Sequence, residues 1–151
     1  MRVYIAATAK DLSAAELTPA RVHAVTPAVQ AELPGEDEEM LELVAFLAAA
    51  DESVILVAER SDRPRRVVIA ADVDARGLAP AEDPEDIATA MLPQGPIGWD
   101  AIAAIHVDDA FAESTVAKAA RGDEQAADDL AEIDLAWYDA TERVDAREFL
   151  G

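Results

Sequence analysis

Residues 65–73, RRVVIAADV, form a continuous apolar run that arginines open and an aspartate closes. A short run rich in β-branched residues and bounded by charged residues is typical of a strand buried on both faces. A second run of this kind, AIHV at residues 104–107, leads into Asp108 and Asp109. Two buried strands in a chain of 151 residues predict a sheet covered by helices.

Outside these two runs, strand patterns alternate with helical patterns. Further strands are predicted at residues 2–8, 21–26, 87–92 and 135–141. Helices are predicted at about 8–17, 36–58, 99–103, 108–120 and 122–133. The expected fold is therefore α/β (or α+β), a single layered domain over residues 1–151 with a mixed sheet of about five or six short strands and four or five helices.

Residues 53–58, SVILVA, fit either secondary structure. Their composition is typical of a strand, but Leu47, Ala50, Val54 and Ala58 continue a helical period. We favour a helix through this segment, either continuous or broken near Asp51, and a strand is the alternative.

The composition limits the classes of function. The net charge is −20, from 32 acidic and 12 basic residues, which weighs against binding to nucleic acid or to an anionic membrane. The chain contains no cysteine, so disulfides, thiolate catalysis and zinc–thiolate sites are excluded. Nothing resembles a signal peptide or a membrane span, and the expected location is a bacterial cytoplasm.

The acidity itself admits two interpretations. Spread evenly, the charges would be largely screened by salt, so only clusters such as residues 36–39, 108–109 and 123–129 would present a usable field. These clusters would attract a protein partner with a basic surface. Alternatively they are helix starts and solvated faces in a protein adapted to its host.

The candidate metal ligands are Asp72, His106, Asp108 and Asp109, which lie at or near the ends of the two buried strands. Carboxylates with one imidazole suit Mg²⁺ or Mn²⁺ if both strands end at the same sheet edge. The alternative is that these aspartates are helix caps and turn residues and that His106 is partly buried. His23 faces the same surface as His106 if their strands are neighbours. No catalytic residue is predicted, because no nucleophile motif, phosphate loop or dinucleotide fingerprint is present.

Two other groups of residues have alternative roles. The basic cluster at residues 60–66 would bind a phosphate or a partner's carboxylate, or would pair with acids of the same chain; it consists of Arg60, Arg63, Arg65 and Arg66. Large aromatic residues in the C-terminal half would anchor an interface or fill the core; they are Trp99, Trp137 and Tyr138.

Several segments resemble a family of short uncharacterised proteins from high-GC Gram-positive bacteria, a domain of unknown function. The matching segments are residues 1–5 with Ala7 and Thr8, 24–28, 65–73, 106–110 and 137–139. Position 6 is Ala where Pro is expected in relatives. The resemblance implies a single cytosolic domain and carries no activity or cofactor.

The residues favour a non-enzymatic cytosolic interaction or regulatory domain that binds a protein partner with a basic surface and needs no cofactor. The alternative is a small divalent-metal-dependent hydrolase that uses the acids and the histidine at the strand ends. The sequence specifies neither the partner nor the oligomeric state.

Overall fold

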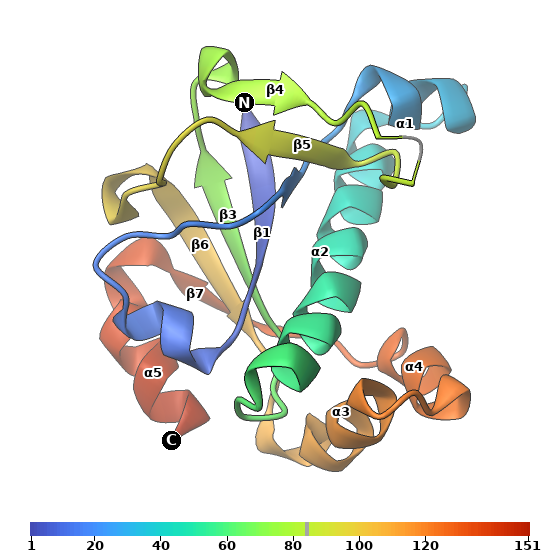
Figure 1. The fold of residues 1–151 in the computed structure, drawn as a ribbon. Coiled ribbons are helices and arrows are strands. Elements are labelled where there is room, and N and C mark those ends of the chain that lie inside the picture. The colour runs from blue at the N-terminus through green and yellow to red at the C-terminus, as the bar shows by residue number, and fades with distance from the viewer. Residues whose placement is uncertain (84) are drawn as a thin grey trace.

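The described residues of the chain form one seven-stranded sheet with helices on both faces (Figure 1). The computed structural model describes residues 1–83 and 85–151. The strands are β1 (Arg2–Ala7), β2 (Val22–His23), β3 (Val67–Asp72), β4 (Leu78–Pro80), β5 (Ala90–Pro93), β6 (Ile102–Val107) and β7 (Ala136–Asp139). The α-helices are α1 (Pro27–Glu32), α2 (Glu38–Arg60), α3 (Glu113–Ala120), α4 (Glu124–Leu130) and α5 (Arg143–Leu150). The short 3₁₀ helices are η1 (Ala9–Ser13), η2 (Ala75–Gly77), η3 (Trp99–Ala101), η4 (Ala110–Ala112) and η5 (Ala140–Glu142).

The strand order is β4-β5-β2-β1-β3-β6-β7, and every pair described in this sheet is antiparallel. The predicted layered α/β domain is confirmed, with seven strands in place of five or six. The sheet is antiparallel where a mixed one was expected. The chain leaves β3 near Ala71 and enters β6 at Ile102, which pairs with Ala71, so these strands run in opposite directions.

One face of the sheet carries the larger apolar core. Side chains that alternate along β1, β3 and β6 point to this face and pack against η1 and α5. The strand residues concerned are Val3, Ile5, Ala7, Val67, Ile69, Ala71, Ile105 and Val107. Leu12 from η1 and Leu150 from α5 cover them, so residues from both ends of the described chain close this side.

The other face is partly covered by α2, which runs unbroken from Glu38 to Arg60. The Asp37 side chain accepts a hydrogen bond from the Met40 amide and begins the helix, and Ser61 ends it in a left-handed conformation with φ of 50°. Residues 53–58 are therefore helical, as favoured, and no break occurs at Asp51. Ser53 and Val57 are spaced four residues apart and are both buried, so the buried face of the helix continues through this segment.

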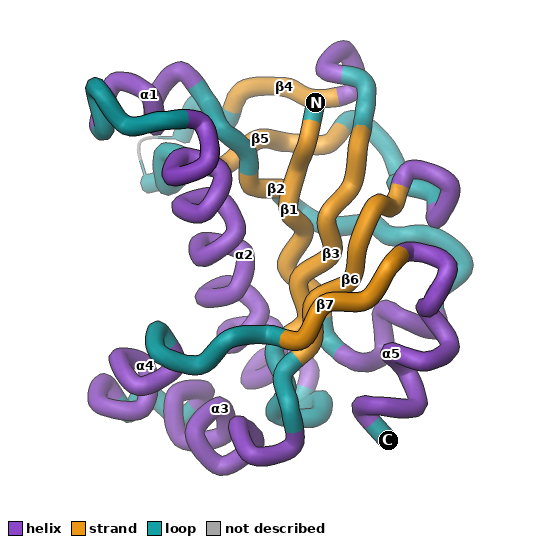
Figure 2. The backbone as a smooth tube through the Cα atoms, turned by 180° about the vertical axis from the view of Figure 1, so that it is seen from behind, coloured by secondary structure: helices purple, strands orange, loops and turns teal. Residues whose placement is uncertain are grey.

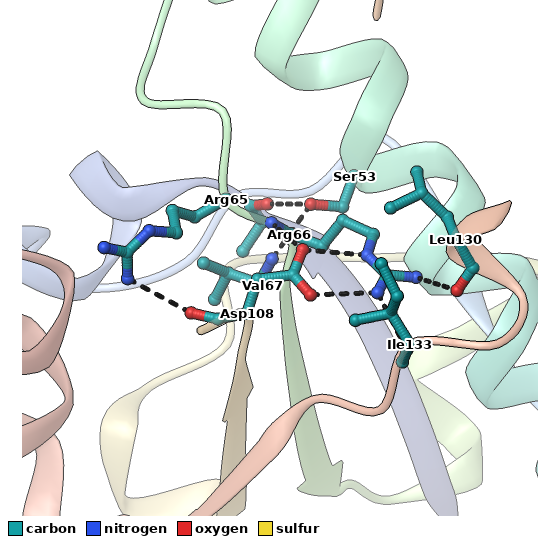
Figure 3. Close-up of polar contacts among 8 residues, drawn as sticks. Ser53, Arg65, Arg66, Val67, Asp108, Leu130 and Ile133 are labelled. Atoms are coloured by element: carbon teal, nitrogen blue, oxygen red, sulfur yellow. Dashed lines mark hydrogen bonds and ion pairs between the residues drawn. The ribbon is translucent and has the colours of Figure 1, made fainter. Parts of the chain in front are cut away.

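Ser53 connects α2 to the two central strands (Figure 3). Its hydroxyl donates to the Ala7 carbonyl oxygen at 2.7 Å and accepts from the Val67 amide at 3.0 Å. Ala7 and Val67 are cross-strand partners, so the serine hydroxyl joins β1 to β3 at the end of their pairing. All three residues are buried, which makes this link part of the interior.

The helix α2 packs mainly on β1, β2 and β3 and leaves part of the sheet free. In Figure 2, β6 and β7 lie on the side of β3 away from α2. The helices α3 and α4 pack together near the C-terminal end of α2. No helix within the described residues is both long and apolar enough to cross a membrane.

Candidate functional site: a groove between α2 and the sheet

The four predicted metal ligands do not meet. Asp72 lies at one end of β3 and forms an ion pair with Arg2, whereas Asp108 follows β6 at the opposite end, next to Arg66. The prediction required both strands to end at one sheet edge, and the antiparallel register separates those ends. Asp109 caps η4, and His106 lies within β6. Within the described residues, no group of three or more His, Cys, Asp or Glu side chains could hold a metal ion.

Asp108 has a structural role (Figure 3). Its carboxylate is fully buried and accepts three hydrogen bonds from Arg66: from the backbone amide at 2.8 Å, from Nε at 2.8 Å and from Nη2 at 2.9 Å. The same guanidinium donates to the carbonyl oxygens of Leu130 and Ile133. The pair thus ties β3 and β6 to the segment that follows α4.

The other arginines of the basic cluster are also engaged within the protein. Arg60 pairs with Asp11 at 2.6 Å, and Arg65 pairs with Glu113 at 2.8 Å. Arg63 donates to the Leu150 carbonyl oxygen. The geometry therefore supports the interpretation that this cluster pairs with acids of the same chain, and it adds hydrogen bonds to backbone carbonyl oxygens.

A groove of about 590 Å³ lies between the first three turns of α2 and the uncovered part of the sheet. Its floor includes Ala70 of β3 and Ala104 of β6, which are cross-strand partners. Because both floor residues are small, the larger residues around them stand higher and form walls. The side chains that line the walls are Arg2, Tyr4, Asp37, Glu39, Met40, Glu42, Leu43, Phe46, His106 and Trp137.

Aromatic rings dominate the interior of the groove. The Phe46 ring lies edge to face with Tyr4, at a centroid distance of 5.9 Å, and with His106, at 4.8 Å. Trp137 on the edge strand β7 is 60% exposed and lies next to His106 across the β6–β7 pair. Four rings from four different elements therefore surround one hollow.

Two polar residues of the groove lining, Tyr4 and Arg2, are each paired with an acidic side chain. The Tyr4 hydroxyl donates to Glu42 at 2.5 Å, and burial together with this carboxylate raises the pKa of Tyr4 to about 12. Arg2 forms two hydrogen bonds with Asp72, at 2.8 and 3.1 Å. This arginine lowers the pKa of Asp72, while Asp72 raises the pKa of Arg2. Tyr4 thus remains neutral at physiological pH, and the charge of Arg2 is matched by Asp72.

His106 has free hydrogen-bonding capacity in the groove wall, because no group in the described part of the chain forms a hydrogen bond with its ring nitrogens. Burial lowers its pKa to about 4, and the nearby Arg2 charge acts in the same direction. At neutral pH the imidazole is therefore uncharged and offers one donor and one acceptor.

We expect the His106 imidazole to titrate with a pKa of about 4 in an NMR pH titration. Its folded-state pKa lies below the unfolded value of 6.5, so the unfolded chain binds more protons between these two values. The contribution of His106 to stability is present above pH 6.5 and is lost as the pH falls towards 4. In urea unfolding, His106→Gln should remove this part of the pH dependence. A His106 midpoint near 6.5 would contradict the burial argument.

Sequence patterns indicated only fragments of this groove. His106 was singled out as a metal ligand and Trp137 as an interface anchor, whereas Tyr4, Glu42 and Phe46 were not identified as site residues. The available signal was the spacing of Glu39, Glu42, Leu43 and Phe46, which places them on one face of a helix.

The remaining predicted residues lie elsewhere. Trp99 and Tyr138 pack against the main core, which supports their role as space-fillers. His23 faces the same side of the sheet as His106, but β1 and β3 separate their strands. It is buried, with Nδ1 at 2.9 Å from the Thr89 hydroxyl and Nε2 at 3.3 Å from Glu52.

A family model described as a family of unknown function, DUF6912, matches residues 1–145. The chain belongs to DUF6912. No curated protein and no solved structure gives a significant match to it. The expected resemblance to a family of unknown function is therefore confirmed. All residues that line the groove of this DUF6912 chain lie within the matched region.

Proposed function

We propose that this protein is a non-enzymatic binding module whose groove receives a basic segment of a protein partner. The observation that carries the proposal is the groove itself, which combines exposed apolar and aromatic side chains with a rim of carboxylates. Such a surface can bury apolar side chains of a partner. Its lining presents no nucleophile and no ordered acid–base pair aimed at a substrate.

The apolar part of the surface extends beyond the groove. Met40, Leu43 and Leu47 are each more than 40% exposed and follow one face of α2, and the first two line the groove together with Trp137. Exposed apolar groups that gather around a hollow mark interaction sites, whereas single scattered ones do not. Trp and Met are also enriched at protein interfaces. A polypeptide covers such an elongated apolar margin better than a small molecule would.

The charge of the site selects a basic partner. The groove lining contains one arginine, which Asp72 already neutralises, against Asp37, Glu39 and Glu42. The whole chain carries −20, so a second copy of it would be repelled at this surface. Charge complementarity therefore favours a cationic segment over self-association.

Two further predictions from the sequence accompany this proposal. A cytoplasmic location and an origin in high-GC Gram-positive bacteria both stay predictions. The alternative of a metal-dependent hydrolase gains no support from the geometry, because its four predicted ligands lie apart.

The test is an NMR titration with a short synthetic peptide that contains Arg, Lys and Leu. We expect shifts at the Trp137 indole and along residues 39–46, and an affinity that falls as salt increases. Trp137→Ala should weaken binding at least about tenfold, because central aromatic residues dominate interface energies.

The matched control is Phe111→Ala, since Phe111 is 68% exposed but lies on η4, away from the groove lining. This variant should bind as the unaltered protein does. Shifts that map elsewhere, or a Trp137→Ala variant with full affinity, would contradict the proposed site. Dimerisation that Trp137→Ala abolishes would replace the basic partner with a second copy.

A further inference from the structure

We propose that the groove recognises an arginine side chain of the partner, whose guanidinium contacts the aromatic walls and donates a hydrogen bond to His106. This inference rests on the proposed function, because it names the chemical group that the groove selects. Three features of the groove support it: the aromatic rings, the unpartnered imidazole and the carboxylates of α2.

The rings of the groove favour a cation with a flat face. Cations bind to the faces of Trp, Tyr and Phe, and a guanidinium can also stack on them through its plane. Tyr4 and Phe46 are fixed by their edge-to-face contact, while Trp137 is open to solvent on the other side. The small floor residues Ala70 and Ala104 leave room for the side chain to enter between these walls.

His106 favours a cation that can donate hydrogen bonds. Its ring is fixed against Phe46 at 4.8 Å, and no described group uses its nitrogens. A guanidinium has five N–H donors in a planar fork, so it can stack on a ring and still donate within its own plane. A quaternary ammonium has no N–H donor, and a lysine ammonium has no plane to stack. Arginine is the side chain that satisfies both requirements.

The carboxylates complete the site. Glu42 accepts the Tyr4 hydroxyl through Oε2 and lines the groove one helical turn before Phe46. A carboxylate has about four lone-pair sites, so Glu42 keeps acceptor capacity for a guanidinium. Glu39 lies one turn earlier on the same face and also lines the groove. Arg2, the one cation in the lining, is held by Asp72 and leaves these acids available.

The test uses four otherwise identical short peptides whose central residue is arginine, citrulline, lysine or trimethyl-lysine. Citrulline is the matched control, because it keeps the planar shape of arginine but has no charge. We expect the arginine peptide to bind the unaltered protein at least about tenfold more tightly than the citrulline peptide, and several-fold more tightly than the two lysine peptides. Binding is followed by the Trp137 indole and His106 resonances.

Two variants separate the role of the acceptor from that of the ring. His106→Phe keeps an aromatic wall but removes the acceptor, so the preference for arginine over trimethyl-lysine should disappear. His106→Gln restores an acceptor and should recover part of this preference. An unchanged preference in His106→Phe would overturn the role of His106.

The outcomes distinguish this inference from the proposed function. If the trimethyl-lysine or citrulline peptide binds in the groove as tightly as the arginine peptide, the arginine inference fails while the proposed function stands. If the peptide that contains Arg, Lys and Leu also fails to bind at the groove, both fail.

Discussion

Replacing Asp108 with alanine should lower the free energy of unfolding by about 3–5 kcal/mol, because the substitution leaves the buried Arg66 charge without its partner. The carboxylate accepts three hydrogen bonds from Arg66, and neither side chain has access to bulk water that could replace them. Urea unfolding followed by circular dichroism measures the loss.

The neighbouring Asp109 provides the control. It is exposed and caps η4 through a hydrogen bond of 3.4 Å from the Phe111 amide. Asp109→Ala should therefore cost at most about 1 kcal/mol. Equal losses in the two variants would contradict the assigned role of the buried pair.

A double variant keeps this prediction testable if Asp108→Ala fails to fold. Arg66→Met combined with Asp108→Leu removes both charges and fills the space with apolar groups. Such replacements of buried ion pairs are often neutral or stabilising, so the double variant should be more stable than Asp108→Ala. A double variant no more stable than Asp108→Ala would mean that the unpaired charge is not the cause.

Replacing Ser53 with alanine should cost about 2–4 kcal/mol, because the Val67 amide and the Ala7 carbonyl both lose a buried hydrogen-bond partner. The removed group is a single hydroxyl, so little packing is lost. Besides urea unfolding, hydrogen exchange should show faster exchange of the Val67 amide.

Ser114→Ala is the matched control, since Ser114 is exposed on α3. This variant should change stability by no more than about 0.5 kcal/mol. If Ser53→Ala changes stability as little as Ser114→Ala, the hydroxyl link between β1 and β3 does not contribute to stability, and the prediction is wrong.

The elements that could be predicted from sequence are those whose signal is local. Strong strand patterns are present at residues 65–73 and 2–8. The acidic residues in the first turn of α2 indicate where this helix begins, and the apolar residues that follow repeat with a helical period. The segment α5 was missed because it is rich in charge and has few apolar residues. Its signal was the pair Asp139 and Glu142, whose side chains form a capping box just before the helix.

Two other elements were missed for different reasons. The helix α1 begins with Thr26 as its cap and Pro27 in its first turn, a start signal that was interpreted only as the end of a strand. The strand β4 has three residues and ends in Pro80, so its position depends on pairing with β5 rather than on its own pattern.

The groove could not be predicted because its walls come from β1, α2, β6 and β7. Tyr4, Phe46, His106 and Trp137 become neighbours only through the order and direction of the strands. The positions of the candidate metal ligands could not be predicted for the same reason. Local sequence does not show whether β3 and β6 run parallel or antiparallel, and the antiparallel arrangement separates the ends at which these ligands lie.

The position of β1 between β2 and β3 has a consequence for synthesis on the ribosome. β1 is synthesised before the other described strands of this sheet and takes a central position in it, yet its full-length neighbour β3 follows only after α2. At about 5–20 residues per second, Val3 and Ile5 wait several seconds before β3 is available to pair with them. During this interval β2, of two residues, is the one described strand that can pair with β1. We therefore expect β1 to need protection in the nascent chain, by the ribosome surface or a chaperone, until residues 67–72 have left the exit tunnel.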